Sequence, residues 1–351
     1  MNNNFDQVPG ELVEKLKNFK AGRPLKIMEV CGTHTVEIHR WGIHNLLPAE
    51  VKLVSGPGCP VCVTPSYYID QAIHLLQQDF IIATFGDLVK VPGNHSTLEK
   101  EKAAGGLVKV VYSPMEVINY ARNTGKQVVF LAVGFETTSP GIAFTIHQCS
   151  ELGINNIKFF CAAKIIKPAM EIIIRNSEID GFLLPGHVST IIGSQSFNFL
   201  AENNIPGVVA GFKPLDLVSS ILQLLSSIKS GNNQIINNYS RAVNQAGNRK
   251  AQMMIEQVFE PGNSEWRGLG NIDHSGLKIN QKYRSNDVEY SIDLNIPREE
   301  VNTGCRCGDV LKGYIDPPQC PLFKKQCNPD NPIGPCMVSK EGSCSAWYWY
   351  G

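Results

Sequence analysis

The sequence has no excess of charge of either sign. Its 351 residues carry 32 Lys and Arg against 32 Asp and Glu, so the formal net charge is zero. Binding to nucleic acid or to an anionic membrane surface depends on a basic excess that meets phosphates. The sequence also lacks an apolar run that approaches the roughly 20 residues of a membrane span. We therefore expect no nucleic-acid partner and no membrane partner.

The N-terminus lacks the pattern of a secretory signal. The stretch MNNNFDQVPGELVEKLKNFK has no charged start followed by an apolar stretch and small residues. We therefore expect a cytoplasmic protein, in a compartment where thiols stay reduced. The chain has 11 cysteines, an odd number. In a reducing compartment this argues against a disulfide framework and favours metal or redox chemistry.

Short apolar runs that end in Gly, Pro or Cys alternate with helical periodicity from Leu25 to about residue 211. Continuous apolar strands that alternate with helices are typical of parallel α/β sheets buried on both faces. The predicted strands are 26–30, 51–54, 80–85, 128–133, 157–162, 181–185 and 207–211. The predicted helices are the first 20 or so residues, then 66–78, 114–124, 140–152, 167–176, 190–202 and 214–228.

The number of strands is high for one small sheet, and the composition changes near 112–126. We therefore predict an α/β fold with two Rossmann-like domains, followed by a domain of loops and short helices that carries an iron–sulfur cluster. An N-terminal helix is expected to pack on this C-terminal domain, which begins with a helix at 235–258. The predicted parts are 1–24, 25–126, 127–228 and 229–351.

The segment from Val301 onward holds six cysteines and six prolines but no histidine. Four Cys thiolates on irregular backbone are the usual ligands of an iron–sulfur cluster. The paired CxxC knuckles of a zinc site are missing. We expect a [4Fe–4S] cluster, with zinc and a disulfide-rich tail as the alternatives. Four ligands leave two of the six cysteines over, and a dithiol/disulfide switch would use such a pair. The six are Cys305, Cys307, Cys320, Cys327, Cys336 and Cys344.

Cys59 and Cys62 form a CxxC motif in the loop SGPGCPVC, directly after a predicted strand. Ligand sites of open α/β sheets lie at the carboxyl ends of strands, and a cytosolic CxxC is a redox or metal-binding pair. Cys31 ends the preceding strand. Three such thiolates would suit Fe(II) and leave positions open for exogenous ligands. Burial as small apolar residues is the alternative, and it is the expectation for Cys149 and Cys161.

Three further glycine-framed strand ends carry acid, hydroxyl and imidazole groups. They are FGD at 85–87, GFETT at 134–138 and PGHVS at 185–189. We expect these groups to line one cleft, with functional roles for Glu136 and His187. Helix N-capping is the alternative for the hydroxyl groups.

The motifs MEVCGTHT, SGPGCPVC, FGDLVKVPG, GFETTSPG, PGHVS and the tail that starts GCRCGDVLKG together resemble the HypD family of [NiFe]-hydrogenase maturation factors. The resemblance covers nearly the whole chain. It implies a scaffold on which an iron acquires two cyanides and one carbon monoxide, as Fe(CN)2CO, before transfer to the precursor of the hydrogenase large subunit. It also implies a stable complex with HypC, and cyanide delivery from a carrier thiocyanate by HypE, which HypF charges.

The resemblance also implies roles for individual residues. Cys31, Cys59 and Cys62 match the cysteines tied to the iron centre and its thiol chemistry. The family often continues CGTHT with a second histidine, whereas Val36 stands there in this chain, so His34 or His39 would have to serve. In the tail, the matched cluster ligands are Cys305, Cys320, Cys327 and Cys344, and the redox-active pair is Cys307 and Cys336.

Three functions are compatible with the residues. An assembly scaffold with redox activity uses every motif. A thiol–disulfide oxidoreductase resembling ferredoxin–thioredoxin reductase would also place a cluster beside a dithiol, but it leaves Cys31 unexplained. A cluster-dependent hydro-lyase uses only three cysteines at the cluster, where one iron acts as a Lewis acid, and it has no need of a CxxC. We expect the scaffold.

Overall fold

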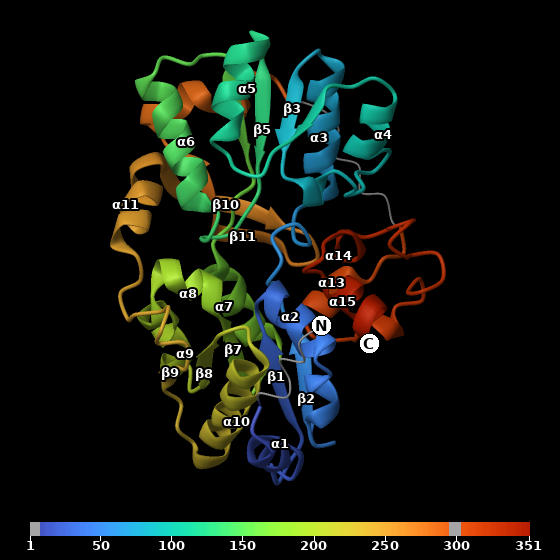
Figure 1. Ribbon diagram of the computed structural model, residues 1–351, viewed down its shortest axis with the longest axis vertical. Coiled ribbons are helices and arrows are strands. Elements are labelled where there is room, and N and C mark those ends of the chain that lie inside the picture. Colours follow the sequence, from blue (N-terminus) through green and yellow to red (C-terminus); the bar gives the residue numbers. More distant parts are fainter. Residues whose placement is uncertain (1–7, 295–302) are drawn as a thin grey trace.

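The computed structural model describes residues 8–294 and 303–351 (Figure 1). It contains two parallel sheets, here called the lower and the upper sheet after their places in Figure 1. The lower sheet has the order β2-β1-β7-β8-β9, with β1 (Leu25–Glu29), β2 (Val51–Ser55), β7 (Gly181–Pro185), β8 (Gly207–Ala210) and β9 (Ile235–Asn237). The upper sheet has the order β4-β3-β5-β6, with β3 (Ile81–Thr84), β4 (Val108–Val110), β5 (Val128–Ala132) and β6 (Ile157–Cys161).

Helices cover both sheets, so the predicted α/β class is confirmed. All seven predicted strands are present. The strands β4 and β9 were missed because three residues are too short to show a pattern. The helices of the α/β region are α2 (Gly32–Arg40), α3 (Ser66–Gln77), α4 (Leu98–Ala103), α5 (Glu116–Thr124), α6 (Ser139–Glu151), α7 (Ile166–Asn176), α8 (Gly186–Ile192), α9 (Asn198–Glu202) and α10 (Pro214–Ser230).

The boundary predicted between residues 126 and 127 does not separate the two sheets. In the upper sheet β3 pairs with β5 through Ile82 and Val129, which lie on opposite sides of that boundary. In the lower sheet β1 pairs with β7 through Met28 and Phe182. The chain therefore crosses from the lower to the upper sheet after β2 and returns before β7. The prediction was wrong here because apolar periodicity locates strands but does not show which strands pair.

The N-terminal helix α1 (Gly10–Lys17) packs on α10 and not on the C-terminal domain, which corrects the second domain prediction. Its Leu16 is fully buried and shares an apolar core with Leu217 and Ile221 of α10. Figure 1 shows α1 at the bottom of the molecule, away from the C-terminal segment. The part of the predicted helix in residues 1–7 lies outside the described residues.

The helix predicted over 235–258 begins later than expected. The strand β9 occupies its start, and the helix α11 spans Arg249–Val258. Asn248 sets this beginning, because its side chain accepts a hydrogen bond from the Ala251 N–H at 3.1 Å and so caps the first turn. An antiparallel hairpin that the sequence analysis missed follows, with β10 (Phe259–Trp266) and β11 (Gly270–Ile279).

The hairpin lies between the two sheets (Figure 1), and Lys164 anchors it. The ammonium group donates hydrogen bonds to Ser264 Oγ and to the Glu265 carbonyl, both at 2.7 Å, and lies over the Trp266 ring. Burial lowers the pKa of Lys164 to about 7. The Ile165 N–H adds a hydrogen bond to the Ser275 carbonyl at 2.8 Å. These contacts fix the position of the hairpin turn.

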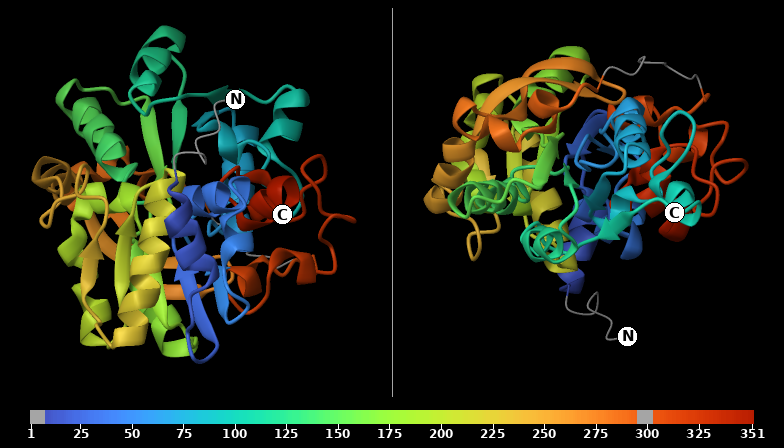
Figure 2. Two further views of the ribbon diagram at one scale, coloured as in Figure 1. Left: turned by 60° about the horizontal axis from the view of Figure 1, so that its bottom comes forward. Right: turned by 90° about the horizontal axis from the view of Figure 1, so that it is seen from above.

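Residues 303–351, called the C-terminal lobe below, consist of loops and short helices, as predicted. After η5 (Gln281–Asn286) and α12 (Val288–Ser291), the lobe contains α13 (Cys307–Leu311), η6 (Pro317–Gln319), α14 (Pro335–Val338) and α15 (Ser343–Tyr350). The helix α15 lies beside α2, so the lobe is attached to the edge of the lower sheet (Figure 2). Within residues 8–294 and 303–351, no helix is long and apolar enough to cross a membrane.

Candidate functional site

A cleft of about 660 Å³ opens where the carboxyl ends of both sheets meet. Loops after β1, β2, β3, β4, β5 and β7 form its walls. The glycine-framed loops predicted to share a cleft do so. The polar groups that line it are Cys31, Thr33, Asp87, Tyr112, Ser113, Thr137, Thr138, His187 and Glu341.

The CxxC loop lies directly against Cys31. The Gly32 N–H donates to the Gly58 carbonyl at 3.1 Å. A Cβ atom on Gly58 would lie 2.3 Å from the Cys31 nitrogen, so only glycine permits this approach. Pro60 and Val61, between the two cysteines of the motif, line the cleft.

Cys59 and Cys62 form a disulfide with a Cα–Cα distance of 5.3 Å, whereas Cys31 is a free, buried thiol. Of the three sulfurs predicted to bind iron, only that of Cys31 is therefore a free thiol in this structure. In the described residues, no group of three or more His, Cys, Asp and Glu side chains is arranged to hold a single metal ion. Reduction of the disulfide would have to precede iron binding by all three sulfurs. Their role as iron ligands stays a prediction.

Two acidic side chains lie close to Cys31. Burial, and then the nearby Glu341 and Glu29, raise the pKa of Cys31 to about 12, so the group is a neutral thiol at neutral pH. Glu29 accepts a hydrogen bond from the Cys31 N–H at 3.0 Å and another from the Thr35 hydroxyl. A metal ion that binds the Cys31 sulfur would have to displace its proton.

His187 and His34 have different positions, although both were predicted site residues. His187 lines the cleft, and its ring stacks on Phe212 with a centroid distance of 3.9 Å. His34 packs against Phe212 at 4.9 Å and is fully buried. Its Nε2 lies 3.3 Å from the Ala210 carbonyl, and burial lowers its pKa to about 4. His187 is thus the histidine whose ring lines the cleft. Neutral His34 is buried and packs on Phe212, which in turn supports the His187 ring.

Glu136 does not line the cleft, unlike its neighbours Phe135 and Thr137. Its Oε1 accepts a hydrogen bond from the Ile166 N–H at 3.0 Å, at the beginning of α7, while Oε2 is buried without a partner. Burial raises its pKa from 4.5 to about 7. Ser189 also points elsewhere, since its hydroxyl donates to the Pro185 carbonyl at 2.7 Å.

This position of Glu136 makes stability depend on pH. Because its pKa is higher in the folded chain, its stabilising contribution is complete below pH 4.5 and is lost as pH rises through about 7. The loss amounts to about 3 kcal/mol. We expect Glu136→Gln to remove this part of the decline, as urea unfolding at pH 4.5 and pH 8 would measure. Equal declines in the variant and the wild-type protein would contradict the expectation.

Glu341 was missed by the sequence analysis because it comes from the C-terminal lobe. The Thr33 hydroxyl donates to its Oε1 at 2.7 Å. A Cβ atom on Gly32 would lie 2.5 Å from the Glu341 Cβ, so the lobe contacts the CGTHT segment directly. Glu341 and Asp87 both face the cleft, and burial, followed by the nearby Glu341 carboxylate, raises the pKa of Asp87. The lobe thus supplies one wall of the cleft.

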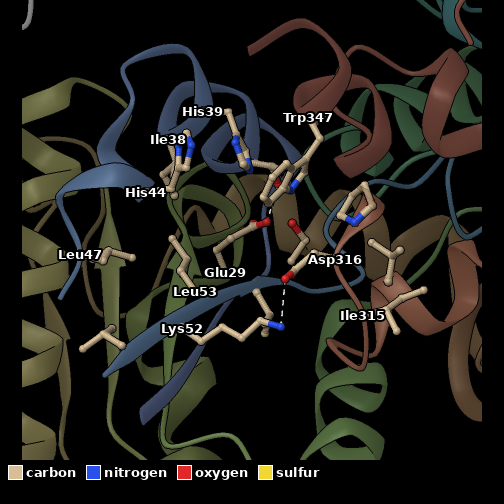
Figure 3. Close-up of a pocket in the computed structure, with 16 residues that line it drawn as sticks. Glu29, Ile38, His39, His44, Leu47, Lys52, Leu53, Ile315, Asp316 and Trp347 are labelled. Carbon is tan, nitrogen blue, oxygen red and sulfur yellow. Dashed lines mark hydrogen bonds and ion pairs between the residues drawn. The ribbon is translucent and has the colours of Figure 1, made fainter. Parts of the chain in front are cut away.

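A second pocket of about 190 Å³ lies behind Glu29, between the lower sheet and the lobe (Figure 3). At one end the rings of His39 and His44 lie 4.5 Å apart, and His39 also packs on Trp347 at 4.7 Å. Burial, and then the His44 charge, lower the pKa of His39 to about 3. The sequence suggested no grouping of these histidines, because the tertiary fold brings Trp347 onto them.

The six thiols of the lobe are gathered in one group. The Cys307 side chain lies close enough to those of Cys305 and Cys336 to interact with both. Cys344 lies within electrostatic reach of Cys305, Cys307, Cys320 and Cys327. The nearby Cys307 side chain, and then burial, raise the pKa of Cys305, and burial raises the pKa of Cys344.

Cys149 and Cys161, in contrast, belong to the apolar core of the upper sheet, as predicted. The chain therefore has two separate cysteine sites, one at the cleft and one in the lobe. These features define a class of protein: a two-sheet α/β protein that presents cysteines in the cleft between its sheets and a second cysteine group beside it.

Comparison with known proteins identifies the family. The profile HypD, described as "Hydrogenase formation hypA family", matches residues 7–351. The chain is 43% identical over 342 residues to "Hydrogenase maturation factor HypD2" of Bradyrhizobium diazoefficiens, covering 94% of this chain and 90% of that protein. It is 42% identical over 352 residues to "Hydrogenase maturation factor HypD" of Escherichia coli, covering 97% and 94%. It is 40% identical over 360 residues to the protein of the same name from Cupriavidus necator, covering 97% and 95%. The chain belongs to the HypD family of hydrogenase maturation factors.

Proposed function

We propose that this maturation factor is a scaffold that holds an iron on Cys31, Cys59 and Cys62 while the iron receives two cyanides and one carbon monoxide. One observation carries the proposal: a single cleft at the carboxyl ends of both sheets contains Cys31 and the loop between Cys59 and Cys62. Soft thiolates suit Fe(II) and leave coordination positions free for small ligands. The volume of about 660 Å³ leaves room for a partner segment that brings these ligands.

The C-terminal lobe is proposed to hold a [4Fe–4S] cluster on Cys305, Cys320, Cys327 and Cys344. Three observations support the fit. Six thiols gather on irregular backbone. A Cβ atom on Gly334 would lie 2.6 Å from the Cys305 sulfur, so only glycine lets the backbone pass this close to that thiol. The Ile333 N–H points at the Cys327 sulfur at 3.4 Å, as a hydrogen bond to a thiolate would.

A cluster of this kind spreads its four thiolates around a cuboidal core. It therefore needs wider spacing than one metal ion does, which agrees with the lack of a single-ion arrangement in the described part of the lobe. When bound, the cluster supplies electrons one at a time.

Cys307 and Cys336 are proposed as the redox-active pair. Their side chains lie close enough to interact with each other. A dithiol at this place would store two electrons, and two thiol protons would leave when the disulfide forms. In this scheme two electrons from an external low-potential donor, taken up through the cluster, reduce the Cys307–Cys336 disulfide. The resulting dithiol then reduces Cys59–Cys62 by thiol–disulfide exchange.

The proposed partners follow from the family. We propose a stable complex with HypC, cyanide delivery by HypE after its charging by HypF, and transfer of the iron to the hydrogenase large-subunit precursor through HypC. We propose that these assembly steps take place in the cytoplasm. A second candidate function, a cluster-dependent thiol–disulfide oxidoreductase, is favoured by the Cys59–Cys62 disulfide beside the lobe.

Infrared spectroscopy separates the two candidates. We expect the chain, purified anaerobically with its partner proteins, to show cyanide and carbonyl stretches of bound iron. We expect Cys31→Ser to lose these bands but to keep the brown colour of the cluster, because Cys31 lies at the cleft and not in the cysteine group of the lobe. A wild-type protein without the bands would favour the oxidoreductase.

A further inference from the structure

The turn of the β10–β11 hairpin touches both cysteine sites. The Arg267 N–H donates to the carbonyl of Val63 at 2.8 Å, and Val63 directly follows Cys62. On the other side, a Cβ atom on Gly268 would lie 2.3 Å from the Cα of Gly308, which follows Cys307. Neither glycine can carry a side chain at this contact. The turn therefore bridges the CxxC loop and the first cysteines of the lobe.

The Arg267 side chain is half-buried at the turn that contacts the lobe. Its Nη1 is buried and has no hydrogen-bond partner. The contact between Gly268 and Gly308 places Arg267 beside Cys307, and so next to the cysteine group of the lobe. A buried donor without an acceptor is costly, and a negatively charged acceptor beside this guanidinium nitrogen would remove that cost. The site therefore fits a state in which the cysteine group carries negative charge.

The hairpin does not need this side chain for its position. Lys164 and the bond from Ile165 to Ser275 anchor it on the upper sheet. The contact to Val63 uses only the backbone of Arg267. A purely structural role would therefore leave the guanidinium group unexplained. An arginine keeps its charge at every accessible pH, so its effect on the cysteines is a fixed electrostatic field.

We propose that Arg267 is a positioning residue that holds negative charge at the cysteine group and thereby favours its reduced state. The inference rests on the proposed function, because it assumes that the lobe takes up electrons through a cluster. Each electron that enters the cluster adds one negative charge without an accompanying proton. A fixed positive charge nearby stabilises that reduced form relative to the oxidised one.

The test compares Arg267→Gln, which removes the charge, with Arg267→Lys, which keeps it. Arg241→Gln serves as a control, because Arg241 pairs with Asp216 at the lower sheet. The midpoint potential of the cluster is measured by dye-mediated titration followed by electron paramagnetic resonance. We expect the equilibrium constant for one-electron reduction to fall at least tenfold in Arg267→Gln, which is a shift of about 59 mV to lower potential. Arg267→Lys and Arg241→Gln should stay within threefold of the wild-type protein.

The outcomes separate this inference from the function on which it rests. A wild-type chain that takes up no cluster would overturn the proposed function and the inference with it. A loaded wild-type chain with an unchanged potential in Arg267→Gln would overturn the inference alone. If Arg267→Gln fails to keep the cluster, the cluster content and potential of Arg267→Lys provide the test. A loaded lysine variant with the wild-type potential supports the role of charge, and loss of the cluster in both variants refutes it.

Discussion

Replacing Cys320 or Cys327 by alanine is expected to remove the cluster from the chain. Both residues lie in the cysteine group of the lobe, where their sulfurs and those of Cys305 and Cys344 lie within electrostatic reach of each other. Each is proposed to supply one of four thiolates. Iron and acid-labile sulfide, measured after anaerobic reconstitution, should fall from about four atoms of each per chain to near zero.

Cys149→Ala is the matched control for this experiment. Cys149 is fully buried in the apolar core of the upper sheet, so the substitution removes a thiol and some packing without touching the lobe. We expect full iron and sulfide content in this variant. Circular dichroism would show that all three variants are folded. Retention of about four irons by both Cys320→Ala and Cys327→Ala would refute the assignment of the cluster to these thiols.

The second large effect is expected in the double variant Cys307→Ser, Cys336→Ser. It should keep the full cluster and lose cyanide transfer. Release of cyanide from a carrier thiocyanate needs two electrons, whereas a cluster delivers them singly. A dithiol/disulfide pair stores two electrons, and the side chains of Cys307 and Cys336 lie close enough to interact with each other. Serine preserves size and hydrogen bonding but forms no disulfide.

Cyanide transfer is measured as the appearance of cyanide stretches when the charged donor is added to the loaded chain. The variant Cys149→Ala, Cys161→Ser removes two thiols elsewhere and should behave as the wild-type protein does. Normal transfer in the Cys307→Ser, Cys336→Ser protein would eliminate the relay. Loss of the cluster would instead mean that one of these two sulfurs is a cluster ligand, and that the six cysteines were divided wrongly.

Much of the cleft could be predicted from the sequence, because its parts are local. A strand run that ends in glycine places the next polar residue at the carboxyl edge of a sheet. This rule located Cys31, Asp87, Thr137 and His187, all of which line the cleft. It failed for Glu136, whose side chain turns to the beginning of α7. Orientation of a side chain within a loop depends on the loop's own dihedral angles, which no periodicity encodes.

Residues contributed by distant segments could not be predicted in this way. Glu341 reaches Thr33 across more than three hundred residues of chain, and Phe212 lies between two histidines only after β8 has joined the lower sheet. The hairpin was missed because the first strand carries Pro261 and Gly262 and shows no alternation of apolar and polar residues. As a result, Arg267 could not be placed beside the cysteines.

The crossing of the chain between the two sheets has a consequence for the order of events during synthesis. All strands of the upper sheet come from one continuous stretch, residues 81–161, so this sheet can close as soon as that stretch has left the ribosome. The strands β1 and β2 are made earlier, yet β1 must wait for β7, which begins at Gly181. Pairings between distant segments form late. We therefore expect Cys31 and the CxxC loop, although among the first parts made, to remain open to solvent and oxidants on the nascent chain until the lower sheet is complete.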